Sequence, residues 1–242
     1  RANRPHDCDL LLDQNLVANY RHRYENLLPD CCSLMLGPEF ALLHPAYPDL
    51  RSKSVFREGS RSRVLVYFGG ADKENLTGTA ISALEIVDKS NISLDVVVSR
   101  KSPHFDKIRS QVRGVDQATI HSDKDTLAWL LEDVDLVVGG GGVSSWERCC
   151  LGIPAIVISL TENQIPASKE LHNRGAIQYL GHKNEVNEQL LADAIGKLLN
   201  APRSKRVFEL CQSLVDGKGT ERVVDRIAKE TGFGISIPFN QA

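Results

Sequence analysis

A chain of 242 residues predicts one or two domains and is long enough to bury a sizeable hydrophobic core. Charged residues make up 25% and the formal net charge is −2, which argues against a sequence-wide attraction to nucleic acid or to an anionic membrane. No apolar run is long enough to span a bilayer, and the six cysteines lack a zinc-type spacing. We therefore expect a cytoplasmic globular protein with reduced thiols, no metal, and no nucleic-acid or membrane partner.

The first part of the chain has little regular pattern. Residues 8–15 (CDLLLDQN) are typical of a short buried strand, but no neighbouring strand is evident. Residues 16–62 are polar and contain prolines that block long helices. We expect residues 1–45 to be the remnant of an N-terminal domain with its linker, and residues 46–242 to form a C-terminal domain. The chain is then expected to be a fragment without its upstream domain.

From residue 63 onward, apolar runs of strand length alternate with amphipathic segments of helix length. This alternation predicts an α/β fold, a Rossmann-like parallel sheet with helices on both faces. The expected strands are 64–68, 94–99, 119–121, 136–138, 155–160 and 177–180. The expected helices are 75–88, 105–112, 125–131, 144–151 and 164–173, followed by 188–200, 204–214 and 219–230.

Ligands of such sheets bind outside the carboxyl ends of the strands, where one glycine-rich loop follows the strand at 64–68. Gly69 and Gly70 would let a backbone approach a ligand, and free N–H groups at the next helix suit phosphate oxygens. The alternative is a tight turn in which Asp72 or Asn75 caps the helix. The residues of this loop favour neither interpretation.

The second loop holds four consecutive glycines, 139–142, followed by Ser144 and Glu147. Such a run indicates close approach to a ligand, and we expect Gly141 to have positive φ with its open side toward a diphosphate. Ser144 and Glu147 spell a capping box, yet Glu147 could instead accept both hydroxyls of a ribose. The loop fits neither the G-x-G-x-x-G fingerprint nor a Walker loop, which disfavours nicotinamide cofactors and P-loop chemistry.

A third loop, 160–164, carries Asn163 and Gln164 at the start of a helix. Amide side chains at this position cap the helix or hydrogen-bond a sugar or diphosphate. Because all three loops follow parallel strands, they meet at one sheet edge. Together they predict a nucleotide-sugar site, with UDP or a UDP-sugar as the ligand.

The run GGGGVSSWERCCLGIPAIVISLTENQ resembles the nucleotide-binding half of GT-B proteins, the fold of the MurG glycosyltransferase. Six segments in order also resemble the PseG family: ANRPHDCDLLLDQN, LGPEFALL, FGGADKENLT, 139–147, LTENQ and LVDGKGTERV. That family hydrolyses UDP-2,4-diacetamido-2,4,6-trideoxy-β-L-altropyranose on the route to pseudaminic acid. The resemblance implies hydrolysis by a base-activated water that attacks the anomeric carbon, without a cofactor.

The resemblance also implies where the substrate would lie. It places the ribose at Glu147, and the diphosphate at Gly70 and Ser144. Further substrate contacts fall on Asn163 and, more weakly, on Gln164. By analogy with MurG-like domains, the uracil would lie against the backbone near Ile120 and His121.

Two departures from the family qualify these expectations. The catalytic base of the family is a histidine in a glycine-rich loop of the N-terminal domain, and nothing in this chain matches that loop, so we expect no catalytic residue here. A substrate-contacting arginine of the family is His44 in this chain, which implies a weaker contact or a different substrate. A glycosyltransferase of the same fold and a non-catalytic nucleotide-sugar-binding module are the alternatives to a hydrolase. Trp129 and Trp146 are expected in the core.

Overall fold

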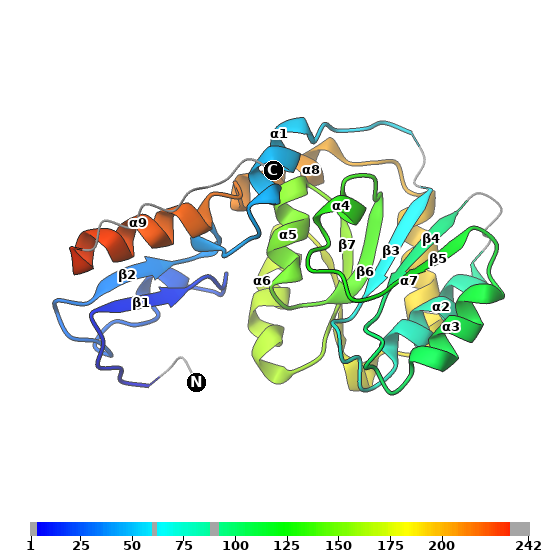
Figure 1. Ribbon diagram of the computed structural model, residues 1–242, viewed down its shortest axis with the longest axis horizontal. Coiled ribbons are helices and arrows are strands. Elements are labelled where there is room, and N and C mark those ends of the chain that lie inside the picture. The colour runs from blue at the N-terminus through cyan, green and yellow to red at the C-terminus, as the bar shows by residue number, and fades with distance from the viewer. Residues whose placement is uncertain (1–3, 60–61, 88–91, 233–242) are drawn as a thin grey trace.

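The computed structural model describes residues 4–59, 62–87 and 92–232. Its centre is a six-stranded parallel sheet in the order β5-β4-β3-β6-β7-β8 (Figure 1). The strands are β3 (Arg63–Tyr67), β4 (Ser93–Val97), β5 (Ala118–His121), β6 (Leu136–Gly140), β7 (Ala155–Ser159) and β8 (Gln178–His182). Counted along the chain this is the order 3-2-1-4-5-6, which places the topological switch point between β3 and β6. The predicted fold class is confirmed.

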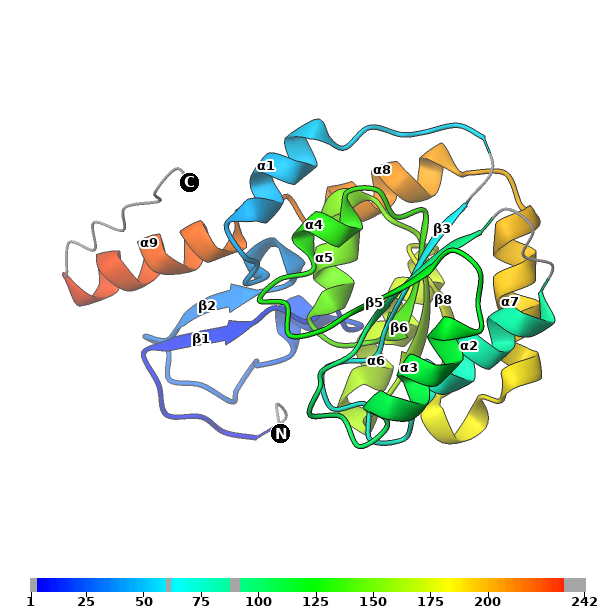
Figure 2. The same cartoon turned by 45° about the vertical axis from the view of Figure 1, so that its right-hand side comes forward.

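Helices cover both faces of this sheet (Figure 2). One face carries α2 (Leu76–Ile86), α3 (Phe105–Arg113) and α7 (Glu188–Asn200). The other carries α1 (Ala46–Lys53), α4 (Ala128–Leu131), α5 (Ser144–Leu151), α6 (Ile165–Arg174) and α8 (Lys205–Leu214). The predicted helices are present, with 125–131 shortened to α4, and the predicted end of the first one at residue 88 lies outside the described residues.

The central strands β6 and β7 are buried along their whole length, and β3 is buried along its middle. On β3, Val64 and Val66 pack into the core beneath α2 and α7, whereas Leu65 packs into the core beneath α5. All three side chains are fully buried. Successive side chains of a strand point to opposite faces, so one short run supplies two cores.

The first segment holds a second, two-stranded sheet that the sequence predicted only in part. The strand expected at 8–15 is β1 (Leu10–Asp13), and its parallel neighbour is β2 (Ser33–Leu36), which was not predicted. The helix α1 was also missed, because Pro48 argued against a helix. Pro48 is the third residue of α1. The first N–H groups of a helix have no acceptor within it, so a proline at this position removes no helical hydrogen bond. Short 3-10 turns complete the elements, at η1 (Tyr20–His22), η2 (Pro38–Phe40), η3 (Glu162–Gln164) and η4 (Lys183–Glu185).

The last helix, α9 (Gly219–Thr231), lies beside β1 and β2 rather than on the six-stranded sheet (Figure 1). Ser33 donates to Glu230 over 2.6 Å, and the Thr220 hydroxyl pairs with both backbone polar groups of Leu43. The division expected at residue 45 assigned this helix to the C-terminal domain. Its contacts instead join it to the first segment.

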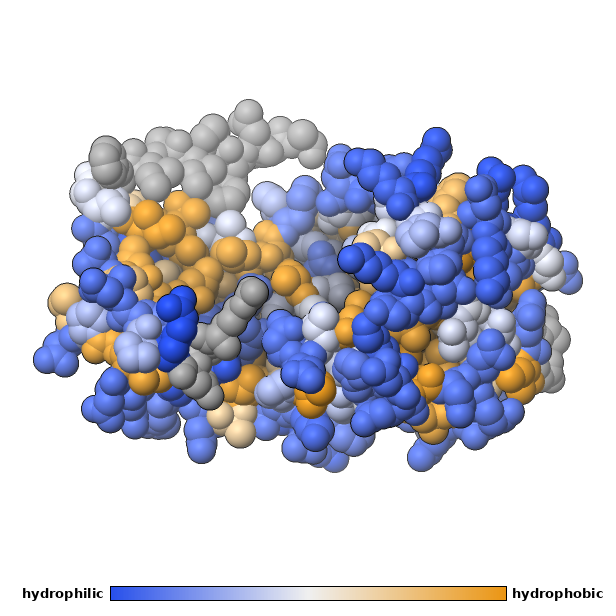
Figure 3. Space-filling model, turned by 90° about the horizontal axis from the view of Figure 1, so that it is seen from below, coloured by the Kyte–Doolittle hydropathy of each residue, from blue (hydrophilic) through white to orange (hydrophobic). Residues whose placement is uncertain are grey.

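Seen from below, hydrophobic side chains gather over the unit made by β1, β2 and α9 (Figure 3). Leu34, on β2, is 40% exposed. The six-stranded part presents a mostly hydrophilic surface in the same view (Figure 3). Within the described residues, no helix is both long and apolar enough to cross a membrane.

Candidate nucleotide-binding site

A cavity of about 480 Å³ opens at the carboxyl edge of the sheet, at the switch point between β3 and β6. The loops after β3, β4, β5, β6 and β7 all contribute to its wall. Its lining includes Tyr67 to Gly70, Ser99, residues 123–127, Gly140, Gly142 to Ser144, Glu147, Leu160 and Gln164. Of the expected site residues, Gly70, Ser144, Glu147 and Gln164 are therefore brought together here.

In the loop after β3, the helix cap that the sequence left open is present and is made by Asp72. Asp72 is buried and caps α2, its two carboxylate oxygens accepting from the N–H groups of Leu76 (2.9 Å) and Thr77 (3.0 Å). The positive end of α2 is thus already met by a carboxylate. Gly69 has φ of 89° and faces open space, whereas Gly70 has room for a Cβ, so the glycine that the backbone requires is Gly69.

The amino end of α5 differs, because no side chain caps it. Ser144 is the first helical residue after the N-cap Val143, so the predicted capping box with Glu147 is wrong. The Ser144 hydroxyl accepts from Nη1 of Arg148 over 3.3 Å instead. The N–H groups of Ser145 and Trp146 donate to the Gly142 and Val143 carbonyls, both over 2.9 Å, and the residues just before them, Val143 and Ser144, line the cavity. This end of α5 is the better place for an anion.

Packing explains most of the glycine run. A Cβ at Gly139 would overlap the carbonyl oxygen of Tyr67, and a Cβ at Gly141 would overlap the hydroxyl of Ser168 on α6. The φ of Gly141 is not positive, and Gly141 does not line the cavity. The expectation that Gly141 opens toward a diphosphate is therefore wrong. It is small because α6 packs against it.

Glu147 is the carboxylate that α5 contributes to the cavity, beside Asp123 and Asp125 from the loop after β5. It lies on the first turn of α5, and burial raises the pKa of its carboxyl group. Its negative charge contributes, after burial, to the raised pKa values of Tyr47 and Tyr67, which places the carboxylate beside both phenols. The Tyr47 hydroxyl interacts with this carboxylate, and the interaction lowers the pKa of Glu147 less than burial raises it. Sequence reasoning missed both tyrosines, and Tyr47 belongs to the helix that was not predicted.

His44 lies near the same carboxylate. A positive charge on His44 lowers the pKa of Glu147, although burial outweighs this effect. The His44 ring is exposed, and its Nδ1 accepts from the Ala46 N–H over 3.2 Å. His44 is not among the residues that line the cavity, so the structure relates it to the site only through this effect on Glu147.

At the end of β5, the polar groups of Ile120 and His121 face different sides. The His121 ring pairs with Oδ1 of the buried Asp95 over 2.7 Å, and its carbonyl accepts from the Val98 N–H over 3.1 Å. Backbone groups alternate in direction along a strand, so the N–H and C=O of Ile120 point away from β4, toward the free sheet edge. Both residues line a hollow of about 440 Å³ that also includes Lys124, a residue of the main cavity.

The two amides after β7 are placed differently. Gln164 lines the cavity and accepts from the Leu160 N–H over 2.9 Å through Oε1. Asn163 is exposed, does not line the cavity, and accepts from the Thr161 hydroxyl over 2.6 Å. In this conformation the Asn163 side chain makes a hydrogen bond within its own loop.

Arg148 is a further residue that sequence reasoning missed. It is only 2% exposed, and its guanidinium lies behind the glycine turn. The available signal was its position four residues after Ser144, which places both side chains on one helix face. Trp146 is buried as expected, but Trp129 is 66% exposed, so its assignment to the core is wrong.

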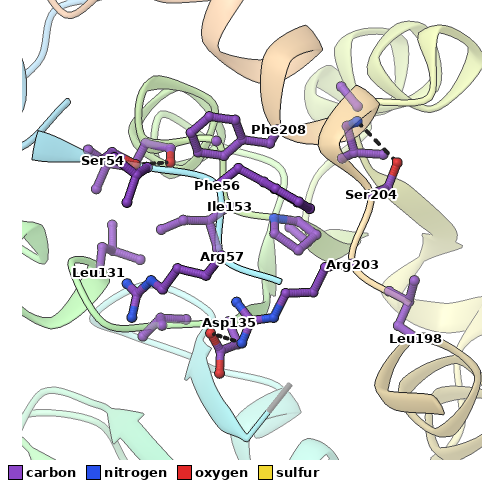
Figure 4. Close-up of a pocket in the computed structure, with 18 of the residues that line it drawn as sticks. Ser54, Phe56, Arg57, Leu131, Asp135, Ile153, Leu198, Arg203, Ser204 and Phe208 are labelled. Atoms are coloured by element: carbon purple, nitrogen blue, oxygen red, sulfur yellow. Dashed lines mark hydrogen bonds and ion pairs between the residues drawn. The ribbon is translucent and has the colours of Figure 1, made fainter. Parts of the chain in front are cut away.

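A second cavity, of about 450 Å³, lies at the opposite edge of the sheet (Figure 4). Phe56 and Phe208 meet there edge to face, with ring centroids 6.0 Å apart, and Arg203 pairs with Asp135 over 2.6 Å. Because Asp135 immediately precedes β6, this cavity lies at the amino ends of the strands, away from the glycine loops. The described residues contain no group of three or more His, Cys, Asp or Glu side chains placed to hold a metal.

Comparisons with known proteins agree with the fold described above. The model of the glycosyltransferase family 28 C-terminal domain matches residues 63–210. The spore coat polysaccharide biosynthesis protein SpsG of Bacillus subtilis is 28% identical over 77% of this chain. The structure of Acinetobacter baumannii MurG matches with a TM-score of 0.64 and 16% identity over 91% of this chain. The structure of S. aureus MnaA with UDP matches with a TM-score of 0.52 and 14% identity over 81% of this chain. The chain spans 56% of SpsG and 66% of MurG.

Proposed function

The chain belongs to the family of the glycosyltransferase family 28 C-terminal domain, and from this premise we propose that it binds the UDP part of a UDP-sugar. The observation that carries this proposal is the half-buried carboxylate of Glu147 on the first turn of α5, whose amino end has no side-chain cap. A helix end attracts a diphosphate, and a carboxylate one turn further accepts two vicinal hydroxyls. Together they match the diphosphate and the ribose of one nucleotide.

The uracil is proposed to lie at Ile120. A uracil presents an N–H donor next to a carbonyl acceptor, and the outward C=O and N–H of one strand residue complement that pair. The hollow at Ile120 adjoins the main cavity through Lys124. Gly69 and Gly70 then flank the diphosphate on the β3 side, and Gln164 and His44 face the sugar.

For the reaction, we propose hydrolysis of the sugar–phosphate bond. The support is the resemblance of six ordered segments to the PseG family, whose product is 2,4-diacetamido-2,4,6-trideoxy-L-altrose. The positive end of α5 would stabilise the negative charge of the departing UDP. The base that activates water is proposed to come from a preceding domain, as the resemblance to the PseG family implies. Of the carboxylates that line the cavity, Glu147 would be occupied by the ribose, and Asp123 and Asp125 lie exposed in the loop after β5.

A glycosyltransferase of the same fold is the second candidate, favoured by the family that the chain matches. We further propose that residues 1–45 are part of a preceding domain. A parallel pair of strands with an exposed apolar side chain is not stable by itself, and β1 and β2 form such a pair. The helix α9 would belong with it.

Two measurements test these proposals. Calorimetry on the 242-residue chain should show saturable binding of UDP, and absence of binding would refute the nucleotide site. The full-length protein, incubated with the UDP-sugar and no acceptor, should release free sugar, followed by NMR. Turnover only when an acceptor is added would replace hydrolysis with glycosyl transfer.

A further inference from the structure

Arg148 lies wholly inside the protein, behind the glycine turn. Helix spacing places it on the same face of α5 as Ser144 and Ser145, four and three residues before it. Side chains of a helix lean toward its amino end. The guanidinium therefore reaches back beneath the turn.

The hydrogen bonds of Arg148 hold this turn together. Its Nη2 donates to the Gly140 carbonyl over 3.0 Å and to the Ser145 hydroxyl over 2.9 Å, and its Nη1 donates to the Ser144 hydroxyl over 3.3 Å. All three acceptors are uncharged. The Nε is buried and has no partner. A Cβ at Gly139 would come within 3.3 Å of Nη1, so this glycine also makes room for the guanidinium.

A buried cation without a carboxylate partner is unfavourable until an anion compensates it. Burial lowers the pKa of Arg148, and the charge of the neighbouring Glu147 offsets this only in part. The hydrogen bond to the Gly140 carbonyl polarises the peptide group that it shares with the Gly141 N–H. In a trans peptide this N–H points away from the guanidinium, and the two neighbours of Gly141, Gly140 and Gly142, line the cavity.

We infer that Arg148 is a positioning residue for the diphosphate, which holds the Gly140–Ser145 turn and carries the positive charge that a bound pyrophosphate neutralises from the other side. This inference rests on the proposed function. It predicts that Arg148 contributes to binding of UDP but not of uridine, because only UDP carries the phosphates. A residue needed only for folding would affect both ligands alike.

The test compares the dissociation constants of UDP and uridine, measured by NMR titration, in the wild-type chain and in Arg148→Met. Methionine is long and unbranched but has no charge. We expect at least 20-fold weaker binding of UDP and binding of uridine within threefold of wild type. Arg174→Met, at the exposed end of α6, is the matched control and should leave both constants unchanged.

Arg148→Lys provides an independent readout should the methionine variant not fold. A buried lysine loses its proton far more readily than an arginine, so its UDP-to-uridine preference should fall at least threefold between pH 7 and pH 9. The wild-type preference should stay constant over that range. An equal loss of affinity for UDP and uridine in Arg148→Met, or a preference for UDP over uridine that does not change with pH in Arg148→Lys, would overturn the inference. Wild-type protein that binds neither ligand would overturn the proposed function as well.

Discussion

Glu147→Gln is the substitution that separates ligand binding from folding most clearly. Glutamine keeps the shape of the side chain and removes its charge. The carboxylate is proposed to accept from both ribose hydroxyls, and hydrogen bonds to a charged group contribute about 1.5–3 kcal/mol. At about 1.4 kcal/mol per tenfold, the dissociation constant for UDP should rise about 10- to 150-fold.

The structure predicts the opposite sign for stability. Burial raises the pKa of Glu147, so the folded state resists the charged form, and removing the charge should leave the melting temperature unchanged or raise it at pH 8. If the variant binds UDP more weakly but its melting temperature is not lower, then Glu147 serves ligand binding rather than stability.

Calorimetry with UDP and 2′-deoxy-UDP provides the assay. The wild-type chain should prefer UDP, and Glu147→Gln should lose most of that preference, because the 2′-hydroxyl then has no charged acceptor. Glu162→Gln, an exposed carboxylate on the neighbouring loop, is the matched control. Binding of UDP within twofold of wild type, with the 2′-hydroxyl preference intact, would refute the ribose assignment.

Three further outcomes follow from the same geometry. Because the pKa of Glu147 is raised, the affinity for UDP should fall as the pH is lowered from 8 through that pKa. Calorimetry should show a larger loss of affinity in the wild type than in Glu147→Gln, because the variant reports only the titration of the phosphate. Asp72→Ala should remove the α2 cap, which lowers stability by about 1 kcal/mol and the melting temperature by roughly 2–4 °C in scanning calorimetry, with UDP affinity unchanged. Gly141→Ala should destabilise by about 1–3 kcal/mol in denaturant titration, because its Cβ meets Ser168, while the folded variant binds UDP within threefold of wild type.

The parallel sheet was predictable because its strands are buried on both faces. Runs such as Val64, Leu65 and Val66 show an apolar stretch of strand length, and the glycine loops follow directly. The missed elements have weaker signals. β2 is four residues long, and Pro48 concealed α1 because its effect depends on where in the helix it falls.

The candidate site was predictable only as a set of loops. Glu147 and Gln164 line the cavity, as their positions after strands implied. The glycine run misled, because Gly139 and Gly141 are required by neighbours distant in sequence, Tyr67 and Ser168. Sequence cannot reveal such contacts before the fold is known.

The side-chain partners were missed for the same reason. A capping box was one alternative for Ser144 and Glu147, but Ser144 does not cap α5 and its hydroxyl accepts from Arg148. A capping box is a local pattern, and a buried guanidinium competes for the same hydroxyl. Trp129 was expected in the core because of its apolar neighbours, yet α4 is so short that this side chain stays at the surface.

The most direct test of the nucleotide site is a UDP titration of the ¹⁵N-labelled 242-residue chain, with amide shifts followed residue by residue. The site described above predicts that the largest changes fall on Gly69 and Gly70, on the turn from Gly140 to Ser144, and on Ile120. Changes concentrated around Phe56 and Phe208, at the opposite edge of the sheet, or no saturable change at all, would contradict it.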